Sequence, residues 1–216
     1  MTASLKSHWE SIYSTKKPEE VSWTEEVPSH SLQVIQLMQL PKTAHIADIG
    51  GGDSKLVDYL IGLGYCHLTL IDISAAAIAR AQKRLGPAAH KVKWIESNVL
   101  DYEPVSPIDL WHDRAAFHFL TQPADVEKYL SILQRFVTGF VLLSTFSTNG
   151  PDKCSGLPVQ QYNELNMVNL LHNDFAKIQC NKHIHVTPAG TEQEFLSCFF
   201  RKKLNNKAWT DFSQNI

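Results

Sequence analysis

The chain has 216 residues, of which 44% are hydrophobic and 19% are charged, and its formal net charge at pH 7 is −2. This is the composition of a globular protein that can bury a full core without the help of disulfides or a metal. Acidic and basic residues are interleaved, so no nucleic-acid-binding surface is indicated. The N-terminus lacks an apolar signal core and no apolar run could span a bilayer, so we expect a cytoplasmic protein with no membrane or nucleic-acid partner.

The four cysteines, Cys66, Cys154, Cys180 and Cys198, are scattered along the chain. None belongs to a Cys-x-x-Cys pair, so their spacing favours reduced thiols over a disulfide framework or a zinc site. Cys154 lies in a long loop rich in turn residues, and no neighbouring base marks it as a nucleophile. We therefore predict that Cys154 is structural or contacts a substrate.

The first predicted element is a short helix over residues 7–13, in which Trp9 and Tyr13 are four residues apart and share one face. A polar loop follows and ends on Trp23. Two interpretations of these aromatic residues stay open, because they could pack the segment onto the rest of the protein or close over a ligand. The next helix is predicted over residues 28–40.

A short apolar run then leads through Asp48 into three consecutive glycines, Gly50, Gly51 and Gly52, and a further helix. The glycines permit positive φ and let the backbone approach a ligand closely. The amides that open the next helix carry partial positive charge. A strand, such a turn and a helix form the nucleotide-cofactor corner of doubly wound α/β folds, although the same pattern also occurs as a purely structural turn.

A second apolar run, residues 67–71, ends on Asp72, which lies 72 − 48 = 24 residues beyond Asp48. This spacing fits one strand-helix-strand unit with an acid placed to bind ribose hydroxyls, and capping of the next helix is the alternative role. Asp48 would repel a pyrophosphate but would suit a cofactor with an ammonium and a sulfonium. Lys55 stands where a dinucleotide fingerprint has its third glycine. These residues indicate S-adenosylmethionine as the cofactor.

Further strands are predicted over residues 91–95, 108–111 and 136–146, with helices over 74–85 and 121–135. Polar residues follow the fourth strand, namely His112, Asp113, Arg114 and His118. Because ligands of open α/β sheets lie beyond the carboxyl ends of the strands, we expect these side chains to line the site. His112 and His118 are candidate general bases, with a core or capping role as the alternative for His118. Arg114 is predicted to pair with Asp113.

The last predicted elements are a helix over residues 160–173 and two strands, 175–186 and 192–201, that form a hairpin. His183 and His185 alternate onto one face of the first of these strands, but no third ligand is placed near them, so we predict no metal site. The whole pattern predicts an α/β fold with a doubly wound, mostly parallel seven-stranded sheet, a C-terminal antiparallel hairpin and helices on both faces.

The sequence Asp48-Ile49-Gly50-Gly51-Gly52 followed by Asp72 resembles motifs I and II of the class I, seven-strand, Rossmann-like S-adenosylmethionine-dependent methyltransferases, over about residues 8–201. Ser54 stands where the family usually has its last glycine. Residues 150–158 and 185–195 resemble a bacterial subgroup of this family whose substrate is unassigned.

The resemblance implies one methyltransferase domain over residues 1–204, with an N-terminal lid over about residues 1–27, and a polar tail over 205–216. It implies that Asp72 binds the ribose of the cofactor and that Asn98 and Val99 hold the adenine. The full set of implied cofactor-binding residues is Trp9, Tyr13, Trp23, Asp48, Gly50, Gly51, Gly52, Asp72, Ile73, Asn98, Val99 and His112.

The expected activity is transfer of a methyl group from S-adenosylmethionine to a small molecule or a protein side chain, with a small molecule favoured. His112 or His118 would take the proton of a hydroxyl or thiol acceptor, whereas an amine or carboxylate would need no base. Two alternatives stay open. An NAD(P)-dependent Rossmann reductase fits Asp72 but not Asp48 or Lys55, and a non-catalytic partner protein could bind S-adenosylmethionine without transferring its methyl group. The sequence indicates neither the acceptor nor the oligomeric state.

Overall fold

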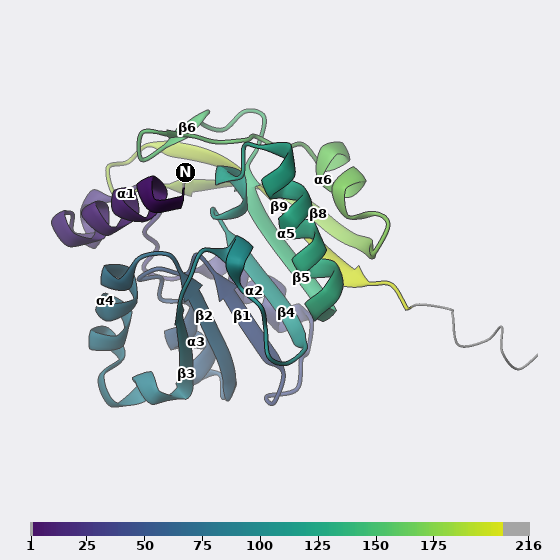
Figure 1. The fold of residues 1–216 in the computed structure, drawn as a ribbon, viewed down its shortest axis with the longest axis horizontal. Coiled ribbons are helices and arrows are strands. Elements are labelled where there is room, and N and C mark those ends of the chain that lie inside the picture. The colour runs from purple at the N-terminus through teal and green to yellow at the C-terminus, as the bar shows by residue number, and fades with distance from the viewer. Residues whose placement is uncertain (1, 205–216) are drawn as a thin grey trace, which may run out of the picture.

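A computed structural model describes residues 2–204, and the predicted polar tail, residues 205–216, lies outside the described part of the chain. Figure 1 shows a central twisted sheet with helices on both faces and with α1 (Thr2–Thr15) beyond one end of the strands. Within residues 2–204, no helix is both long enough and apolar enough to cross a membrane.

Seven strands form one sheet in the order β3-β2-β1-β4-β5-β9-β8. The strands are β1 (His45–Ile49), β2 (His67–Asp72), β3 (Val92–Glu96), β4 (Ile108–Arg114), β5 (Val137–Phe146), β8 (Phe175–Val186) and β9 (Glu192–Lys202). The first five are parallel, and β9 is antiparallel to both of its neighbours. The predicted fold class, including the closing antiparallel hairpin, is therefore confirmed.

The helices also lie close to their predicted positions. They are α2 (Ser29–Leu37), α3 (Leu56–Gly62), α4 (Ala75–Leu85), α5 (Pro123–Phe136) and α6 (Glu164–Leu171). Short 3-10 helices are η1 (Pro18–Glu20), η2 (Gly86–Lys91), η3 (Val99–Asp101) and η4 (Phe117–Phe119). The turn-rich stretch after β5 contains a small hairpin of β6 (Lys153–Cys154) and β7 (Leu157–Pro158), which the sequence analysis treated as loop.

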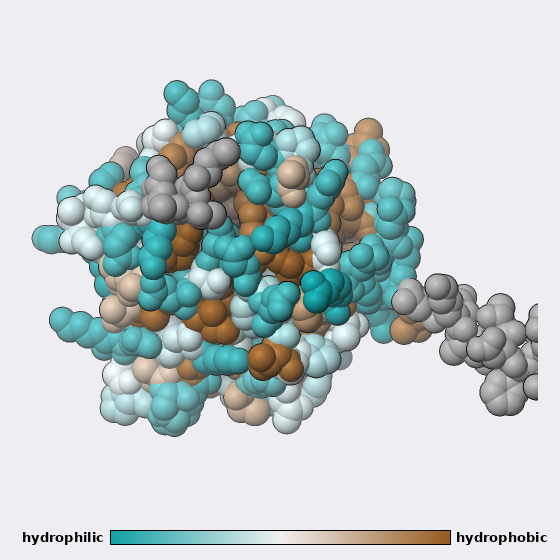
Figure 2. Space-filling view, viewed as in Figure 1, coloured by the Kyte–Doolittle hydropathy of each residue, from teal (hydrophilic) through white to brown (hydrophobic). Residues whose placement is uncertain are grey.

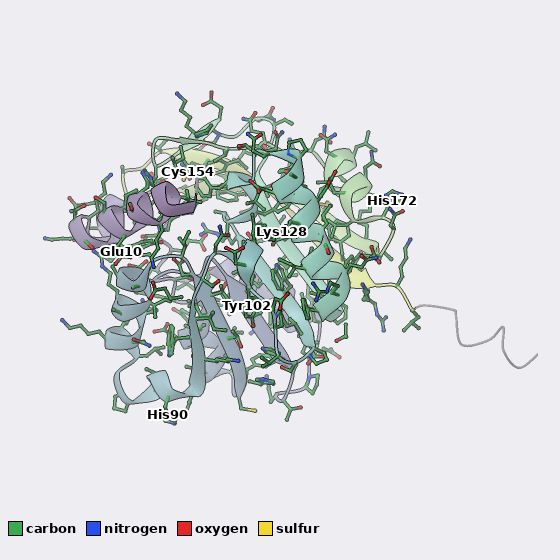
Figure 3. The ribbon with its side chains drawn as sticks, viewed as in Figure 1. Glu10, His90, Tyr102, Lys128, Cys154 and His172 are labelled. Atoms are coloured by element: carbon green, nitrogen blue, oxygen red, sulfur yellow. A yellow bond between two sulfur atoms is a disulfide. The ribbon has the colours of Figure 1, made fainter. Side chains whose placement is uncertain are left out.

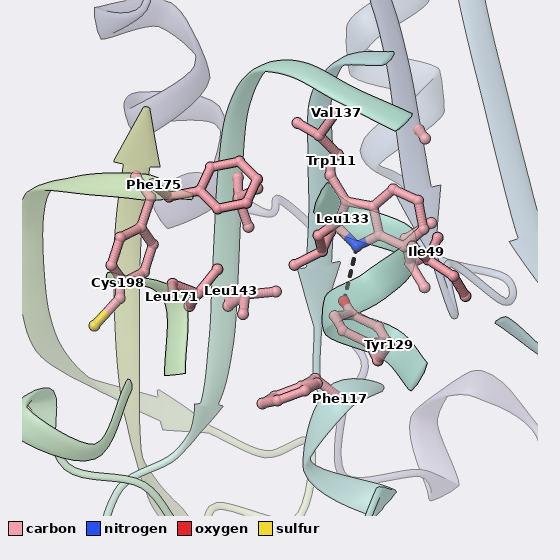
Figure 4. Packing of buried hydrophobic residues seen from close by; sticks show 14 of the residues in the cluster. Ile49, Trp111, Phe117, Tyr129, Leu133, Val137, Leu143, Leu171, Phe175 and Cys198 are labelled. Atoms are coloured by element: carbon pink, nitrogen blue, oxygen red, sulfur yellow. Dashed lines mark hydrogen bonds between the residues drawn. The ribbon is translucent and has the colours of Figure 1, made fainter. Parts of the chain in front are cut away.

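Helices α5 and α6 cover one face of the sheet through a large apolar cluster (Figure 4). Trp111 of β4 is fully buried there, and its Nε1 donates a hydrogen bond to the hydroxyl of Tyr129 of α5 at 2.7 Å. An unpaired buried N–H group would cost about 1–3 kcal/mol, so this bond allows the large ring to occupy the core.

Helices α2, α3 and α4 cover the opposite face. Ile35 of α2 and Leu60 of α3 are fully buried in the cluster that contains Ile46 of β1. Side chains alternate across a strand, so β1 gives Ile46 to this face and Ile49 to the other. Both faces of the sheet are thus closed by helices, as a mostly parallel sheet requires.

The strand order places a crevice at the carboxyl ends of β1 and β4. The chain passes from β1 toward β3 on one side and from β4 toward β5 on the other, so the connections diverge between β1 and β4. Ligands of open α/β sheets bind at such a switch point. The fold therefore positions the loops after β1, β2, β3 and β4 around one site.

The structure corrects the prediction of four reduced cysteines, because Cys180 in β8 and Cys198 in β9 form a disulfide. The two residues are directly opposite each other in the antiparallel register, with Cα atoms 4.1 Å apart. Short Cys-x-x-Cys spacings reveal only pairs that are close along the chain, whereas the hairpin brings together residues 18 positions apart. Cys66 and Cys154 are free thiols.

Candidate active site

A cavity lies at the carboxyl ends of β1, β2 and β4, where the fold places the switch point. All of the predicted cofactor-binding residues except Gly52 line it, namely Trp9, Tyr13, Trp23, Asp48, Gly50, Gly51, Asp72, Ile73, Asn98, Val99 and His112. Residues that were not predicted also line it, including Glu25, Ser31, Ala115, Phe119 and Leu120. The face drawn in Figure 2 is mostly hydrophilic, with apolar residues in patches between the polar ones.

The turn between β1 and α3 depends on its glycines for two reasons. Gly50 and Gly52 have φ angles of 61° and 51°, which favour glycine. Each also has a close neighbour, because a Cβ on Gly50 would lie 2.6 Å from the Cβ of Ala116 and one on Gly52 would lie 2.5 Å from the hydroxyl of Tyr13. The absence of side chains therefore lets the loop after β4 and helix α1 pack directly against the turn.

Asp72 ends β2, is buried and lines the cavity. Its Oδ1 accepts a hydrogen bond from the backbone N–H of Ser74 at 2.8 Å, while Ser74 itself caps α4 by accepting from Ala77 N. Burial raises the pKa of Asp72 to about 7; the amides of Ser74 and Gly52 lower it, and the charge of Asp48 adds to the rise. The carboxyl therefore changes its charge near neutral pH.

Asn98 and Val99, after β3, also line the cavity. The Oδ1 atom of Asn98 accepts a hydrogen bond from Leu100 N at 3.0 Å and so caps η3. The oxygen is already engaged in the turn by one hydrogen bond, whereas both donors of the NH₂ group of Asn98 can contact a ligand. Asn98 therefore forms the turn and also has a position on the cavity wall.

Three buried polar side chains form a chain of hydrogen bonds on the cavity wall. His112 Nδ1 lies 2.8 Å from Asp48 Oδ1, and His112 Nε2 lies 2.9 Å from the hydroxyl of Ser31 on α2. An ionised carboxylate can only accept, so Nδ1 carries the proton and Nε2 accepts from Ser31. Ser31 was not predicted, since nothing in its sequence neighbourhood distinguishes it from an ordinary polar residue on an amphipathic helix.

The second carboxylate oxygen of Asp48, unlike the first, has no hydrogen-bond partner within residues 2–204. Asp48 is only 3% exposed, and this Oδ2 atom is buried. A buried anionic oxygen without a partner is costly, so it favours a cationic or hydrogen-bond-donating group in the adjacent cavity.

The structure corrects the predicted pairing of Arg114 with Asp113. Arg114 lines the cavity and forms an ion pair with Glu25 at 2.9 Å, and it also donates to the backbone oxygen of Trp23 at 3.0 Å. Asp113 instead accepts from the hydroxyl of Tyr129 at 2.6 Å on the other side of the sheet. The two side chains cannot meet, because consecutive residues of a strand point to opposite faces.

Glu25 completes a second polar group on the wall. Burial raises the pKa of Glu25, but a hydrogen bond with His185 and the charge of Arg114 outweigh it, so the net pKa is lowered. Glu25 is therefore an anion at neutral pH and compensates the buried guanidinium of Arg114. Sequence reasoning missed Glu25, which stands in an ordinary polar loop.

The loop after β4 is held by Asp113. Its Oδ1 accepts from the backbone N–H groups of Ala116 and Phe117, both at 3.0 Å. Burial raises the pKa of Asp113 to about 6, and the hydrogen bonds from Tyr129 and these amides oppose the rise. Within this loop Ala115 has a φ of 67°, an uncommon conformation for a residue with a side chain, and it lines the cavity. Asp113 thus shapes the cavity wall without facing it.

His118 is not among the residues that line the cavity; it is fully buried in the core. Burial lowers its pKa to about 3, and the charge of Arg114 acts in the same direction. Its Nδ1 accepts from the backbone N–H of Phe146 at 3.4 Å. The structure therefore places His118 in the core role that the sequence left open, and His112 is the candidate base that reaches the cavity wall.

The aromatic residues of the N-terminal segment contact one another and line the cavity. The ring of Trp9 lies 5.1 Å from that of Phe119 and 5.6 Å from that of Trp23, and the ring of Tyr13 lies 6.0 Å from that of Trp23. These edge-to-face contacts pack the segment onto the loop after β4. Both interpretations of the aromatic residues therefore fit the same arrangement.

Cys154 is buried on the cavity wall. Burial raises the pKa of its thiol to about 11, and contacts with Ser22 and Arg114 only partly oppose the rise. The thiol is therefore protonated at neutral pH, which does not suit a nucleophile.

His183 and His185 of β8 contact other residues of the protein. His183 stacks on His30 with ring centroids 4.1 Å apart, and His185 Nε2 lies 2.6 Å from the backbone oxygen of Ser22. In the part of the chain that the structure describes, no cluster of three or more His, Cys, Asp or Glu side chains is arranged to hold a metal ion.

Comparison with known proteins gives a family match. Residues 46–138, which include the glycine turn, Asp72 and the loop after β4, match the family model described as a methyltransferase domain. A search of curated protein sequences found no match.

Solved structures share the fold at low sequence identity. A structure from work on the conversion of a disulfide bond into a thioacetal group during echinomycin biosynthesis is 15% identical, with a TM-score of 0.73 over 96% of this chain and 97% of that chain. The 1,6-didemethyltoxoflavin-N1-methyltransferase of Burkholderia thailandensis, which holds 1,6-didemethyltoxoflavin and S-adenosylhomocysteine, is 18% identical, with a TM-score of 0.68 over 94% and 88%. A SAM-dependent methyltransferase of Anabaena variabilis is 12% identical, with a TM-score of 0.70 over 94% and 95%.

Proposed function

Because the chain belongs to the class I S-adenosylmethionine-dependent methyltransferases, we propose that it transfers the methyl group of this cofactor to a small molecule held beyond the end of β4. The observation that carries the proposal is the cavity at the switch point of the sheet. It joins a glycine turn, a buried acid at the end of β2 and a buried carboxylate oxygen without a partner.

The cavity residues suit the parts of the cofactor one by one. We assign the ribose hydroxyls to Asp72, the adenine to Asn98 and Val99 with Ile73 beside them, and the methionine end to the glycine turn. The Oδ2 atom of Asp48 has no hydrogen-bond partner within residues 2–204, so a cationic group beside it would be favourable. We assign the ammonium group of the cofactor to this position. Bound S-adenosylmethionine supplies an electrophilic methyl group on a sulfonium.

The other half of the cavity is suited to a small acceptor. Apolar and aromatic side chains line it, including Trp23, Phe119 and Leu120, and Arg114 with Glu25 gives it a single charged pair. Such a mixture of apolar walls and few polar groups is typical of small-molecule sites. We propose that residues 1–27 act as a lid over it, since Trp9 and Tyr13 of α1 and Trp23 line the cavity.

A route for the acceptor's proton is present on the wall. Because both ring nitrogens of His112 are engaged, an acceptor would reach His112 through the hydroxyl of Ser31. Ser31 would accept the proton of a hydroxyl or thiol while passing its own proton to Nε2, and Asp48 would stabilise the resulting imidazolium. An amine acceptor with a free lone pair would not use this route.

Calorimetric titration with S-adenosylmethionine, NADH and NADPH tests the proposal. We expect micromolar binding of S-adenosylmethionine, weakened about 100-fold or more in Asp72→Ala, because the variant loses charge-assisted hydrogen bonds to the ribose. Glu127→Ala, which removes an exposed carboxylate on α5, is the matched control and should bind as the wild type does.

Binding of NADH or NADPH in place of S-adenosylmethionine would contradict the proposal and favour the reductase alternative. The non-catalytic alternative makes a different prediction. It would retain binding of S-adenosylmethionine, yet no small molecule or protein in cell extracts would acquire the labelled methyl group.

A further inference from the structure

Besides its aromatic contacts, helix α1 is attached to the rest of the protein by a partly buried carboxylate contact. Glu10 lies on the side of α1 that faces α4 (Figure 3). Its Oε2 accepts a hydrogen bond from the hydroxyl of Ser74 at 2.7 Å, and its Oε1 accepts from the backbone N–H of Ala76 at 3.1 Å. Glu10 therefore caps the N-terminus of α4 from another helix.

The charge of Glu10 suits this position. The first amides of a helix are unpaired and carry partial positive charge, so a carboxylate is favoured there. Ser74, the N-cap of α4, is fully buried and already accepts from Ala77 N, so its hydroxyl proton is free to bind Glu10. The ion pair of α1 with Glu96, formed by Lys6, is about half exposed and contributes little.

The same serine also contacts the proposed ribose site. The backbone N–H of Ser74 donates to Asp72 Oδ1 at 2.8 Å, while its hydroxyl donates to Glu10. One residue thus joins the carboxylate that docks the lid to the carboxylate that we assign to the ribose. A shift of α1 away from α4 would leave the Ser74 hydroxyl and the Ala76 amide without their partner.

We propose that Glu10 is a positioning residue that couples the docking of α1 to the binding of the cofactor's ribose at Asp72. This inference rests on the proposed function. Trp9 and Tyr13 of α1 line the cavity, so the docked helix holds the cofactor in place, and an undocked helix opens its way out. By linkage, cofactor bound at Asp72 stabilises the docked helix to the same degree as the docked helix stabilises the bound cofactor.

Stopped-flow measurement of S-adenosylhomocysteine binding tests the coupling, with the fluorescence of the cavity-lining Trp9 and Trp23 as the signal. We expect Glu10→Ala to increase the dissociation rate about tenfold and to change the association rate little. The charge-assisted hydrogen bonds of Glu10 exist only when α1 is docked, so their loss destabilises the docked, cofactor-bound state alone. Glu10→Gln keeps the shape of the side chain without its charge, so its dissociation rate should lie between those of the wild type and Glu10→Ala. Lys6→Ala, on the same helix, is the matched control and should dissociate as the wild type does.

A second measurement separates coupling from simple packing. In the Asp72→Asn background, Glu10→Ala should change the dissociation rate by less than about threefold, because the ribose contact that the lid supports is already weakened. The same tenfold effect in both backgrounds would overturn the coupling, as would a dissociation rate in Glu10→Ala within about twofold of the wild type. If the wild type does not bind S-adenosylhomocysteine at all, the proposed function fails as well, so the two failures are distinguishable.

Discussion

The two halves of the cavity are built in different ways. In the cofactor half, Asp72 at the end of β2 and Asn98 after β3 are held by neighbours in the chain, since Asp72 accepts from Ser74 and Asn98 from Leu100. In the acceptor half, the partners are far apart in sequence. His112 binds Ser31 across 81 residues, and Arg114 binds Trp23 across 91.

This difference determines which parts of the site can be recognised from a short stretch of sequence and which depend on the tertiary structure of this chain. A turn whose geometry comes from its own glycines and its own acid can be recognised in a short window of sequence. A wall assembled from α2, the N-terminal loop and β4 depends on how those segments pack, so its chemistry follows from the tertiary structure. The acceptor half is therefore where changes should alter the protein without disturbing the cofactor half.

The largest expected effect is the loss of stability on Glu25→Gln, which removes a charge from the acceptor half alone. This change leaves the guanidinium of Arg114 buried without its anionic partner, so we expect the free energy of unfolding to fall by about 3 kcal/mol. Affinity for S-adenosylhomocysteine should stay within about twofold of the wild type at temperatures where the variant is folded.

Denaturant unfolding and calorimetric titration measure the two quantities for Glu25→Gln. Glu103→Gln is the control, since Glu103 pairs with Arg135 at 3.9 Å on the surface, where loss of the pair should change stability little. Equal losses of stability in the two variants would show that the Arg114 pair behaves as an exposed one.

The junction of the two halves is the next target. Gly50→Ala would place a Cβ 2.6 Å from the Cβ of Ala116 at a φ of 61°. We expect stability to fall by about 2 kcal/mol from the combined strain and contact, and binding of S-adenosylhomocysteine to weaken as the turn moves.

Gly64→Ala is a matched control for the backbone term in Gly50→Ala. Gly64 follows α3 and has a φ of 86°, but a Cβ there would meet nothing within 4 Å. It should therefore lose only the cost of a positive φ, about 1 kcal/mol. A loss of stability in Gly64→Ala as large as in Gly50→Ala would refute a role for the contact with Ala116.

The smallest effect is a pH dependence confined to the cofactor half. The pKa of Asp72 is raised to about 7 in the ligand-free protein, mainly by burial. Ribose hydroxyls donate to the ionised carboxylate and so lower this pKa on binding, which means that protons compete with the cofactor. Affinity for S-adenosylhomocysteine should therefore rise from pH 6 to pH 8, by at most about tenfold.

Calorimetric titration across this pH range measures the dependence, with Asp72→Asn as the control. The variant has no titrating carboxyl at this position, so its weaker binding should not change with pH in the same way. An affinity of the wild type that falls with rising pH would contradict the assignment of the ribose to Asp72.

Much of the fold was predictable, because hydrophobic periodicity and turn residues are local signals. Strands predicted over residues 108–111 and 192–201 are found as β4 (Ile108–Arg114) and β9 (Glu192–Lys202). β4 continues through the polar residues that the prediction placed after it. A strand buried between neighbours accommodates polar side chains where they reach a cavity or a hydrogen-bond partner, and periodicity alone does not reveal this.

The candidate site was predictable only where its chemistry is local. The glycine turn, Asp72, Asn98 and Val99 lie together as expected. Ser31 and Glu25 gave no signal, because their partners are remote, and the pairing of Arg114 with Asp113 was wrong because the extended strand separates adjacent side chains. The role of each predicted cofactor-binding residue stays a prediction until binding is measured.

The disulfide between Cys180 and Cys198 has a practical consequence for preparing the protein. It joins two strands that are already hydrogen-bonded neighbours, and neither cysteine is among the residues that line the cavity. A preparation made under reducing conditions and one made under oxidising conditions are therefore two covalent species with the same cofactor site. Mass spectrometry before and after thiol alkylation should accompany every comparison of variants, so that a shift in melting temperature is not assigned to a substitution when it comes from the oxidation state of the sample.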